Sequence, residues 1–220
     1  GGFNYPKSLQ VVNGQALLDR AIDSYSDSGS QTVVAINKEE NDEFLISQTI
    51  NRSKSNVKVI EVSSTARGAL ISALFCLSET DMTEPLVIAA GDSIVNGGIK
   101  KHVNALIAQD VAAGTIAFVS TNPRWSYLSV GENGQVLEVA EKDAIGPLAT
   151  TGVFYFRSGA LFLEAAKWVV INNALVGGQF YVSTSLNYLI SEGMKVGFQE
   201  IKREEYLSFS LPSDFVSQVE

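Results

Sequence analysis

The chain has 220 residues, of which 45% are hydrophobic and 18% are charged, a balance typical of a globular domain and not of a disordered segment. Its net charge of −8 disfavours general nucleic-acid binding, because an acidic surface repels the phosphate backbone. No apolar run approaches the roughly 20 residues that cross a bilayer, and no signal-peptide pattern opens the chain, so we expect a cytoplasmic protein that binds neither nucleic acid nor membrane.

The first half of the chain alternates between helix-like and strand-like runs. Apolar residues at helical spacing predict helices at 15–25, 41–54, 66–77 and 99–108, the second of them capped by Asn41 and the third buried. Short apolar or alternating runs predict strands at 33–36, 57–62, 86–90 and 115–120. This alternation implies a largely parallel sheet with helices on both faces.

The second half changes character. Two β-rich runs, at 127–130 and 135–139, flank an Asn-Gly pair, which is a strong hairpin signal. Further along we predict a strand at 153–156, helices at 160–171 and 184–191, a strand at 196–201, and a terminal helix that opens at Pro212. With no repeat or linker in view, we expect residues 1–220 to form a single domain. Residues 1–12 contain no clear buried strand, so we expect that domain to be N-terminally incomplete.

The single cysteine and the single histidine exclude several chemistries. Cys76 lies in an apolar run and is expected to be buried; one cysteine can make neither an intrachain disulfide nor a zinc site. His102 follows two lysines and is expected at the surface. Because no G-x-S-x-G elbow is present, we set hydrolase triads aside.

Two charged residues occupy positions where an open α/β sheet binds ligands, beyond the carboxyl ends of its strands. Asp92 directly follows the strand at 86–90, where a carboxylate suits Mg²⁺; alternatively it caps the following segment. Lys7 follows Pro6 and offers a point charge for phosphate, or it is simply solvated.

A second acidic and basic pair ends the hairpin. Adjacent side chains on a strand point to opposite faces, so Glu141 and Lys142 reach one pocket only if a loop or bulge turns both inward. The alternative is an exposed hairpin end. Downstream, Gly152 would let the backbone approach a ligand closely.

Two aromatic segments remain open. Trp125 and Tyr127 either border a site or pack under the hairpin. The segment 177–181, which ends in Tyr181, is either a pocket rim or a helix stop.

In this order, the segments resemble the sugar-phosphate nucleotidyltransferase family, and the resemblance covers nearly the whole chain. Tyr5-Pro6-Lys7-Ser8-Leu9 followed by Val12-Asn13-Gly14-Gln15-Ala16-Leu17-Leu18 is similar to the family's Pro-Lys-Pro-Leu and Val-x-Gly-Lys-Pro-Leu block. Thr65-Ala66-Arg67-Gly68-Ala69 resembles its base-holding segment, and Gly91-Asp92-Ser93 its metal aspartate. Patterns of one subgroup resemble Asn122–Tyr127, Glu138–Lys142, Ala149–Phe156 and Gly178–Val182.

The resemblance implies a Rossmann-like, glycosyltransferase-A-type α/β fold with a mixed, mainly parallel sheet. It implies nucleotidyl transfer from an NTP to a sugar 1-phosphate for surface polysaccharide synthesis, with pyrophosphate released, and a possible homo-oligomer. Under this reading Asp92 holds Mg²⁺, Lys7 meets phosphate, Glu141 binds sugar hydroxyls and Lys142 binds the sugar phosphate. The remaining expected substrate-binding residues are Thr65 and Gly68 at the base, Thr151 and Gly152 at the sugar, and Gly91, Trp125 and Tyr181.

The chain also departs from the family pattern. The family's Gly-x-Gly-x-Arg loop lies just upstream of Pro-Lys, where this chain has only Gly1-Gly2-Phe3. Ser208 stands where many members carry a second metal aspartate, Ser8 replaces the second proline, and Gln179 replaces a frequent glutamate. The alternative function is therefore a catalytically silent sugar-nucleotide-binding or assembly module. A glycosyltransferase ranks last, because it normally needs an Asp-x-Asp triplet that the sequence lacks.

Overall fold

The computed structural model describes residues 5–26 and 30–216, so the prediction for residues 1–4 lies outside the described residues. The helices of eight or more residues are α1 (Leu17–Tyr25), α3 (Ile46–Ser53), α4 (Ala69–Cys76), α5 (Lys100–Ala108), α6 (Gly159–Ile171) and α7 (Val182–Ser191). Shorter helices are α2 (Lys38–Phe44) and α8 (Pro212–Val216). No helix among the described residues combines the length and apolarity that a membrane crossing needs.

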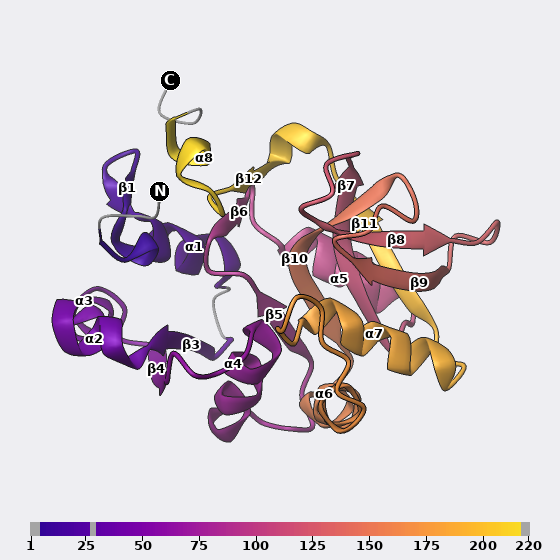
Figure 1. Ribbon diagram of the computed structural model, residues 1–220, viewed down its shortest axis with the longest axis horizontal. Helices are drawn as coiled ribbons and strands as arrows, with labels where there is room; N and C mark the ends of the chain where they lie inside the picture. Colours follow the sequence, from indigo (N-terminus) through magenta and orange to yellow (C-terminus); the bar gives the residue numbers. More distant parts are fainter. Residues whose placement is uncertain (1–4, 27–29, 217–220) are drawn as a thin grey trace.

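A six-stranded mixed sheet forms the larger half of the molecule (Figure 1). Its order is β11-β7-β10-β8-β9, and β5 also pairs with β10. Because β10 runs antiparallel to β5, β7 and β8 while β11 runs parallel to β7, four of the six strands share one direction. This confirms the predicted α/β fold class. The strands are β5 (Leu86–Ala89), β7 (Ala113–Val119), β8 (Ser126–Val130), β9 (Val136–Glu141), β10 (Leu148–Phe156) and β11 (Val196–Glu200).

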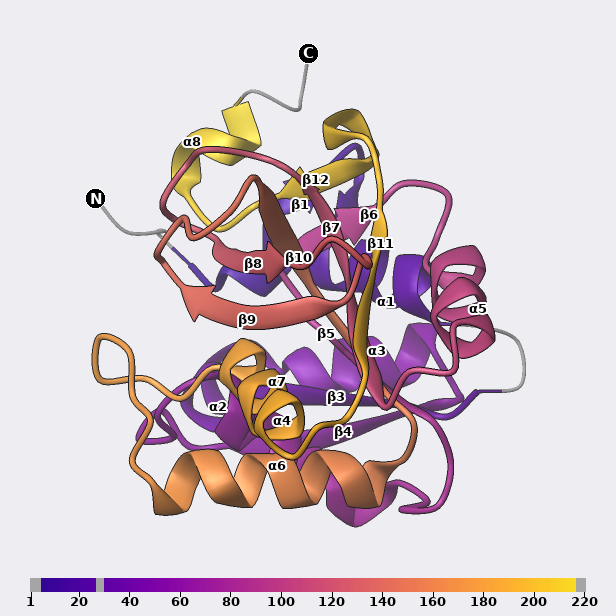
Figure 2. The same ribbon diagram turned by 90° about the vertical axis from the view of Figure 1, so that its right-hand side faces the viewer.

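Alternate side chains of β10 show that both faces of this sheet are covered. Phe154 and Phe156 pack into a core that α6 and α7 share. Val153 and Tyr155 point to the opposite face, where Tyr155 meets Leu106 of α5. The helices therefore lie on both sides of the sheet, as Figure 2 shows for α5 and for the α6–α7 pair.

A separate parallel pair, β3 (Thr32–Asn37) and β4 (Val57–Val62), forms the smaller half with α1, α2 and α3. In both views β3 is the strand of this pair that lies nearer to β5 (Figures 1 and 2). Within the described residues, β3 pairs only with β4 and β5 only with β10. Both strands are half-buried and apolar, with none of the charges or prolines that usually protect an edge.

The helix predicted at 41–54 is in fact two helices. Asn37 caps α2 by accepting a hydrogen bond from the Glu40 amide at 2.8 Å. Leu45 then breaks the run with a left-handed φ of 54°. The predicted cap, Asn41, is buried inside α2. Its side-chain carbonyl accepts a hydrogen bond from the Ser47 amide at 2.7 Å and so links α2 to α3 across the break.

The prediction of a buried helix at 66–77 is also wrong in part. Only Leu70 of α4 is buried, and Phe75 is 54% exposed. Cys76 is partly exposed, although burial still raises the pKa of its thiol to about 11. This apolar helix packs beside β3, β4 and α6, and the rest of its surface is partly exposed.

His102 is buried, with 8% of its surface exposed, which contradicts the surface position expected from its two neighbouring lysines. It lies in the first turn of α5, and its Nε2 has no hydrogen-bond partner among the described residues. Burial, and to a lesser degree the nearby Lys101, lower the pKa of His102 below its usual value of 6.5; Glu205 acts in the opposite sense.

A pH dependence of stability follows. Because the pKa of His102 is lower in the folded state, the unfolded chain binds its proton first as the pH falls. We expect the free energy of unfolding to decrease below about pH 6.5 and to decrease less steeply in His102→Gln. Urea denaturation of both proteins between pH 7.5 and 5 measures this. Identical slopes would contradict the assigned direction of the shift.

Candidate functional site

A β-bulge in β10 marks the point where the predicted site segments meet. The pairing of β10 with β7 shifts register between Thr150 and Phe154, and Gly152 within this interval has a φ of 78°. On the other side of β10, β5 ends where Ala89 faces Val153, and β8 begins near Tyr127, which faces Ala149. The carboxyl end of β5 and the amino end of β8 therefore converge at the bulge, a common setting for binding sites.

Lys7 and Asp92 form an ion pair at the end of β5. The Lys7 Nζ lies 2.5 Å from Asp92 Oδ2, and both side chains are partly exposed. The Ala90 amide donates to the Gly152 carbonyl at 3.2 Å, which ties this strand end to the bulge. The structure thus brings together three residues that the sequence assigned to phosphate, metal and sugar binding.

Ser208 lies on the strand that pairs with the segment after Asp92. β12 (Tyr206–Ser208) pairs with β6 (Ser93–Val95) so that Ser208 faces Ser93, and the Phe209 amide donates to the Asp92 carbonyl at 2.8 Å. Ser208 is only 2% exposed. Serine therefore stands at the position, one residue from the backbone contact with Asp92, at which the resemblance places a second carboxylate.

The fit of this site to Mg²⁺ rests on one carboxylate. Among residues 5–26 and 30–216, no group of three or more histidine, cysteine, aspartate or glutamate side chains is arranged to hold a metal. Mg²⁺ often takes one or two carboxylates and completes its shell with water and substrate phosphates. Asp92 fits that mode, provided that the ion displaces the Lys7 ammonium from its carboxylate.

Two tyrosines that the sequence did not single out support the Asp92 segment, the partly buried Tyr25 and the buried Tyr206. The Tyr25 hydroxyl lies 2.9 Å from Ser93 Oγ, and Tyr206 also hydrogen-bonds Ser93. Burial raises the pKa of Tyr25 and Tyr206 far above the usual range, so both hydroxyls stay neutral. Neither residue carries a local sequence signal, because Ser93 joins them only in the folded chain.

Glu141 and Lys142 form the second cluster, at the end of β9. Glu141 faces Ser126 in the β8–β9 pairing, and its Oε2 accepts hydrogen bonds from Ser126 and, at 2.8 Å, from Ser183. Lys142 has a left-handed φ of 58°. Its Nζ lies 5.2 Å from the centre of the Tyr181 ring.

The left-handed backbone at Lys142 turns the Glu141 and Lys142 side chains in the same direction. Glu141 contacts Ser183 and Lys142 contacts Tyr181, so both side chains turn towards the start of α7 instead of pointing to opposite faces. A hydrogen bond with Tyr181 is the main reason that the pKa of Lys142 is raised. The ammonium, which is exposed, therefore keeps its charge at neutral pH.

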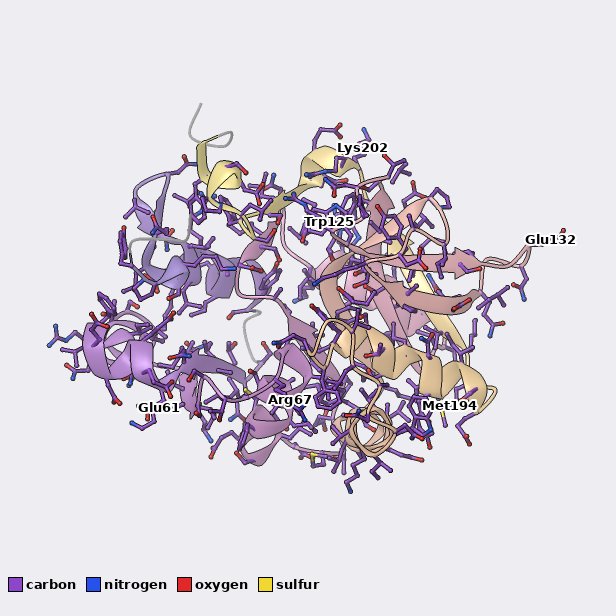
Figure 3. The ribbon with its side chains drawn as sticks, viewed as in Figure 1. Glu61, Arg67, Trp125, Glu132, Met194 and Lys202 are labelled. Atoms are coloured by element: carbon purple, nitrogen blue, oxygen red, sulfur yellow. The ribbon has the colours of Figure 1, made fainter. Side chains whose placement is uncertain are left out.

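Gly68 joins the predicted base-holding segment to the segment 177–181. Gly68 has a φ of 99° and a ψ of 169°, a conformation that is essentially restricted to glycine. A Cβ there would lie 2.3 Å from the Phe180 carbonyl oxygen. The Phe180 amide donates to the Arg67 carbonyl at 2.9 Å, and the Arg67 guanidinium lies 5.4 Å from the Phe180 ring centre (Arg67 is labelled in Figure 3). Thr65 nearby is exposed.

Two of the expected substrate residues have other contacts, and a third, Gly91, has open space beside it. Trp125, labelled in Figure 3, packs edge-on against Phe118 and Tyr206, with ring centres 5.7 and 5.6 Å away. Thr151 is fully buried and donates its hydroxyl to the Ile116 carbonyl at 3.1 Å. Gly91 has room for a Cβ, the nearest atom being 3.8 Å away in Leu18.

A cavity of about 490 Å³ lies elsewhere, along the outer edge of β4. Its lining includes Ser47, Lys58, Glu61 and Glu79, and none of the predicted site residues. We therefore place the candidate site at the β10 bulge and not in this cavity.

The comparisons with known proteins agree with this architecture. The model of the nucleotidyl transferase family matches residues 4–173, more than half of the chain. The chain therefore belongs to the nucleotidyl transferase family, a family of transferase enzymes. No curated protein matches the sequence significantly.

Solved structures show the same fold at low sequence identity. The nucleoside-diphosphate-sugar pyrophosphorylase from Vibrio cholerae RC9 is 18% identical, with a TM-score of 0.83 over 99% of this chain and 93% of its own. The inositol-1-phosphate CTP transferase from T. maritima is 15% identical, with a TM-score of 0.71 over 98% of this chain and 88% of its own.

The close approach at Gly68 is testable by a matched pair of substitutions. Gly97→Ala introduces a Cβ at a φ of 81° with open space around it, and should cost about 1–2 kcal/mol. Gly68→Ala adds the clash with Phe180 and should destabilise by at least about 1 kcal/mol more. Urea denaturation compares the two variants. Equal decreases in the free energy of unfolding would show that the 177–181 segment shifts to accommodate the added Cβ and is not held by this contact.

Proposed function

We propose that the protein transfers a nucleotidyl group from an NTP to a sugar 1-phosphate. The observation that carries the proposal is the convergence of two acidic and basic pairs, Lys7–Asp92 and Glu141–Lys142, on either side of the β10 bulge. The similarity to a nucleoside-diphosphate-sugar pyrophosphorylase and to an inositol-1-phosphate CTP transferase supports it. Family membership supports the reaction class.

In this proposal the reaction is a single displacement. An oxygen of the sugar phosphate attacks the α-phosphorus of the NTP, the bond between the α-phosphorus and the bridging oxygen breaks, and pyrophosphate leaves with the bonding electrons. The protein forms no covalent bond, so its contribution is positioning and charge stabilisation. Mg²⁺, when bound at Asp92, would neutralise charge on the phosphates.

Each pair then has a distinct part. Lys7 leaves Asp92 and meets a phosphate of the nucleotide, which frees the carboxylate for the metal. Lys142 binds the sugar phosphate as a point charge, and Glu141 accepts a hydrogen bond from a sugar hydroxyl. Thr65 and Gly68, on the loop before α4, lie towards the nucleotide base.

We further propose that the described fold takes up one more strand, between β3 and β5. Two unpaired, apolar and half-buried edges support this, because such edges normally lie inside a sheet. The setting that we propose is surface polysaccharide synthesis in the cytoplasm by a homo-oligomer; the pathway and the assembly rest on the resemblance to the family.

A catalytically silent sugar-nucleotide-binding module is the second candidate. The observations that favour it are the serine at position 208, where the resemblance expects a second carboxylate, and the ion pair that occupies the Asp92 carboxylate. Pyrophosphate release separates the two candidates. The full natural chain, with any residues that precede Gly1, is assayed with Mg²⁺, four NTPs and a panel of sugar 1-phosphates. Release that needs both substrates supports transfer, and ligand binding without release supports the silent module.

Removal of the Asp92 charge tests its proposed role. Asp92→Asn keeps the shape of the side chain but removes the anion, so we expect turnover to fall by about 100-fold or more. Asp110→Asn is the control, because Asp110 pairs with Arg157 away from the site. The readout is the rate of pyrophosphate release at saturating Mg²⁺. Turnover that Asp92→Asn leaves intact would remove Asp92 from the chemistry.

A carboxylate at position 208 tests the single-carboxylate site. Ser208→Asp should strengthen Mn²⁺ binding by about tenfold or more, since a second oxygen anion then lies beside Asp92. Ser208→Asn adds the same bulk without charge and should not strengthen binding. Electron paramagnetic resonance of free Mn²⁺ measures affinity without turnover. Equal affinities for the aspartate and asparagine variants would place Ser208 outside reach of the ion.

A further inference from the structure

The carboxylate of Glu141 is held asymmetrically. Its Oε2 accepts two hydrogen bonds, one from Ser126 Oγ and one from Ser183 Oγ. A carboxylate oxygen has two acceptor sites, so these two hydroxyls saturate Oε2. Within residues 5–26 and 30–216, Oε1 has no hydrogen-bond partner.

The two serines approach Glu141 from different elements. Ser126 begins β8 and lies opposite Glu141 across the strand pair, so its position is fixed by the backbone ladder. Ser183 lies in the first turn of α7 and is 2% exposed, so it cannot exchange Glu141 for water without leaving its place in the core. Hydrogen bonds to a charged group are among the stronger ones in proteins. The two hydrogen bonds therefore hold Oε2 in place and restrict the orientation of the carboxylate group.

We propose that Ser126 and Ser183 are specificity-determining positioning residues that hold Glu141 so that Oε1 alone faces the substrate. A carboxylate that is free at both oxygens can accept from two neighbouring hydroxyls of a sugar. This carboxylate offers only Oε1, so it cannot span two neighbouring hydroxyls of the sugar phosphate with its two oxygens. The inference rests on the proposed function, because it assigns the sugar phosphate to this cluster.

Serine-to-alanine variants test the two hydrogen bonds from Ser126 and Ser183 to Glu141. With the full natural chain and the sugar 1-phosphate that gives the highest turnover in the panel, Ser183→Ala should raise KM for the sugar phosphate by about tenfold, from the loss of one charge-assisted hydrogen bond. KM for the NTP should change less than twofold. Ser183→Thr, which keeps a hydroxyl, should restore most of the sugar-phosphate KM.

A matched control separates positioning from general packing. Ser185 lies in the same helix, is fully buried, and donates to the Val182 carbonyl at 2.6 Å, with no hydrogen bond to Glu141. Ser185→Ala should leave the sugar-phosphate KM within twofold of the natural chain. If Ser183→Ala and Ser185→Ala have the same effect, or if both substrates' KM values rise together, the proposal is overturned.

The dependence on Glu141 is tested by a double-mutant cycle. In a Glu141→Ala background, Ser183→Ala should have no further effect on KM, since the serine acts only through the carboxylate. An undiminished effect in that background would show that Ser183 acts by another route. Thermal unfolding of each variant confirms that it is folded.

Deoxy analogues test the contact at Oε1. Among analogues of that sugar 1-phosphate lacking one hydroxyl each, at least one should show a loss of binding that Glu141→Ala abolishes; if no analogue does so, the contact between Glu141 and the sugar is overturned. Calorimetry measures these affinities without turnover. If the natural chain neither binds nor turns over any sugar phosphate, the proposed function is wrong. If it does both and the serine variants behave as the control, only the proposed role of Ser126 and Ser183 is wrong.

Discussion

The bulge in β10 is the constraint on which the rest of the site depends. An unbroken β10 would pair with β5 and β8 as one continuous edge, and the loops after β5 and before β8 would have no common point. The extra residues between Thr150 and Phe154 break the ladder, and the left-handed backbone of Gly152 turns a carbonyl to the Ala90 amide. Two strand ends that are distant in sequence thereby face the same space.

A second departure from regular strand geometry performs the same task on β9. The left-handed backbone at Lys142 sends Glu141 and Lys142 to the same segment, 181–183, although neighbours on a strand normally diverge. Both devices use local backbone conformations that are costly outside glycine, and both occur where charged side chains gather. Such strain is commonly found at functional sites, where the surrounding structure holds it in place.

Much of the fold was accessible from the sequence, because periodicity encodes burial directly. The strand at 57–62 and the hairpin after Ser126 follow from alternation and from an Asn-Gly turn. The break at Leu45 was not accessible, since Asn37 and Asn41 are equally good caps by type. In the site, Asp92 and Glu141 were found because they end strands, whereas Ser183 and Tyr25 depend on contacts between distant segments. The burial of His102 was not predicted, because the two lysines that precede it suggested an exposed segment, although His102 lies on the buried face of α5.

Helix α1 belongs to both halves of the molecule. Leu18 and Ile22 of α1 pack with the β3–β4 half, while Leu17 of the same helix packs with Ile94 of β6. Because β6 begins directly after Asp92, the same helix links the packing of the smaller half to the position of that carboxylate. A core substitution in the β3–β4 half can therefore change the site through α1 without touching a site residue.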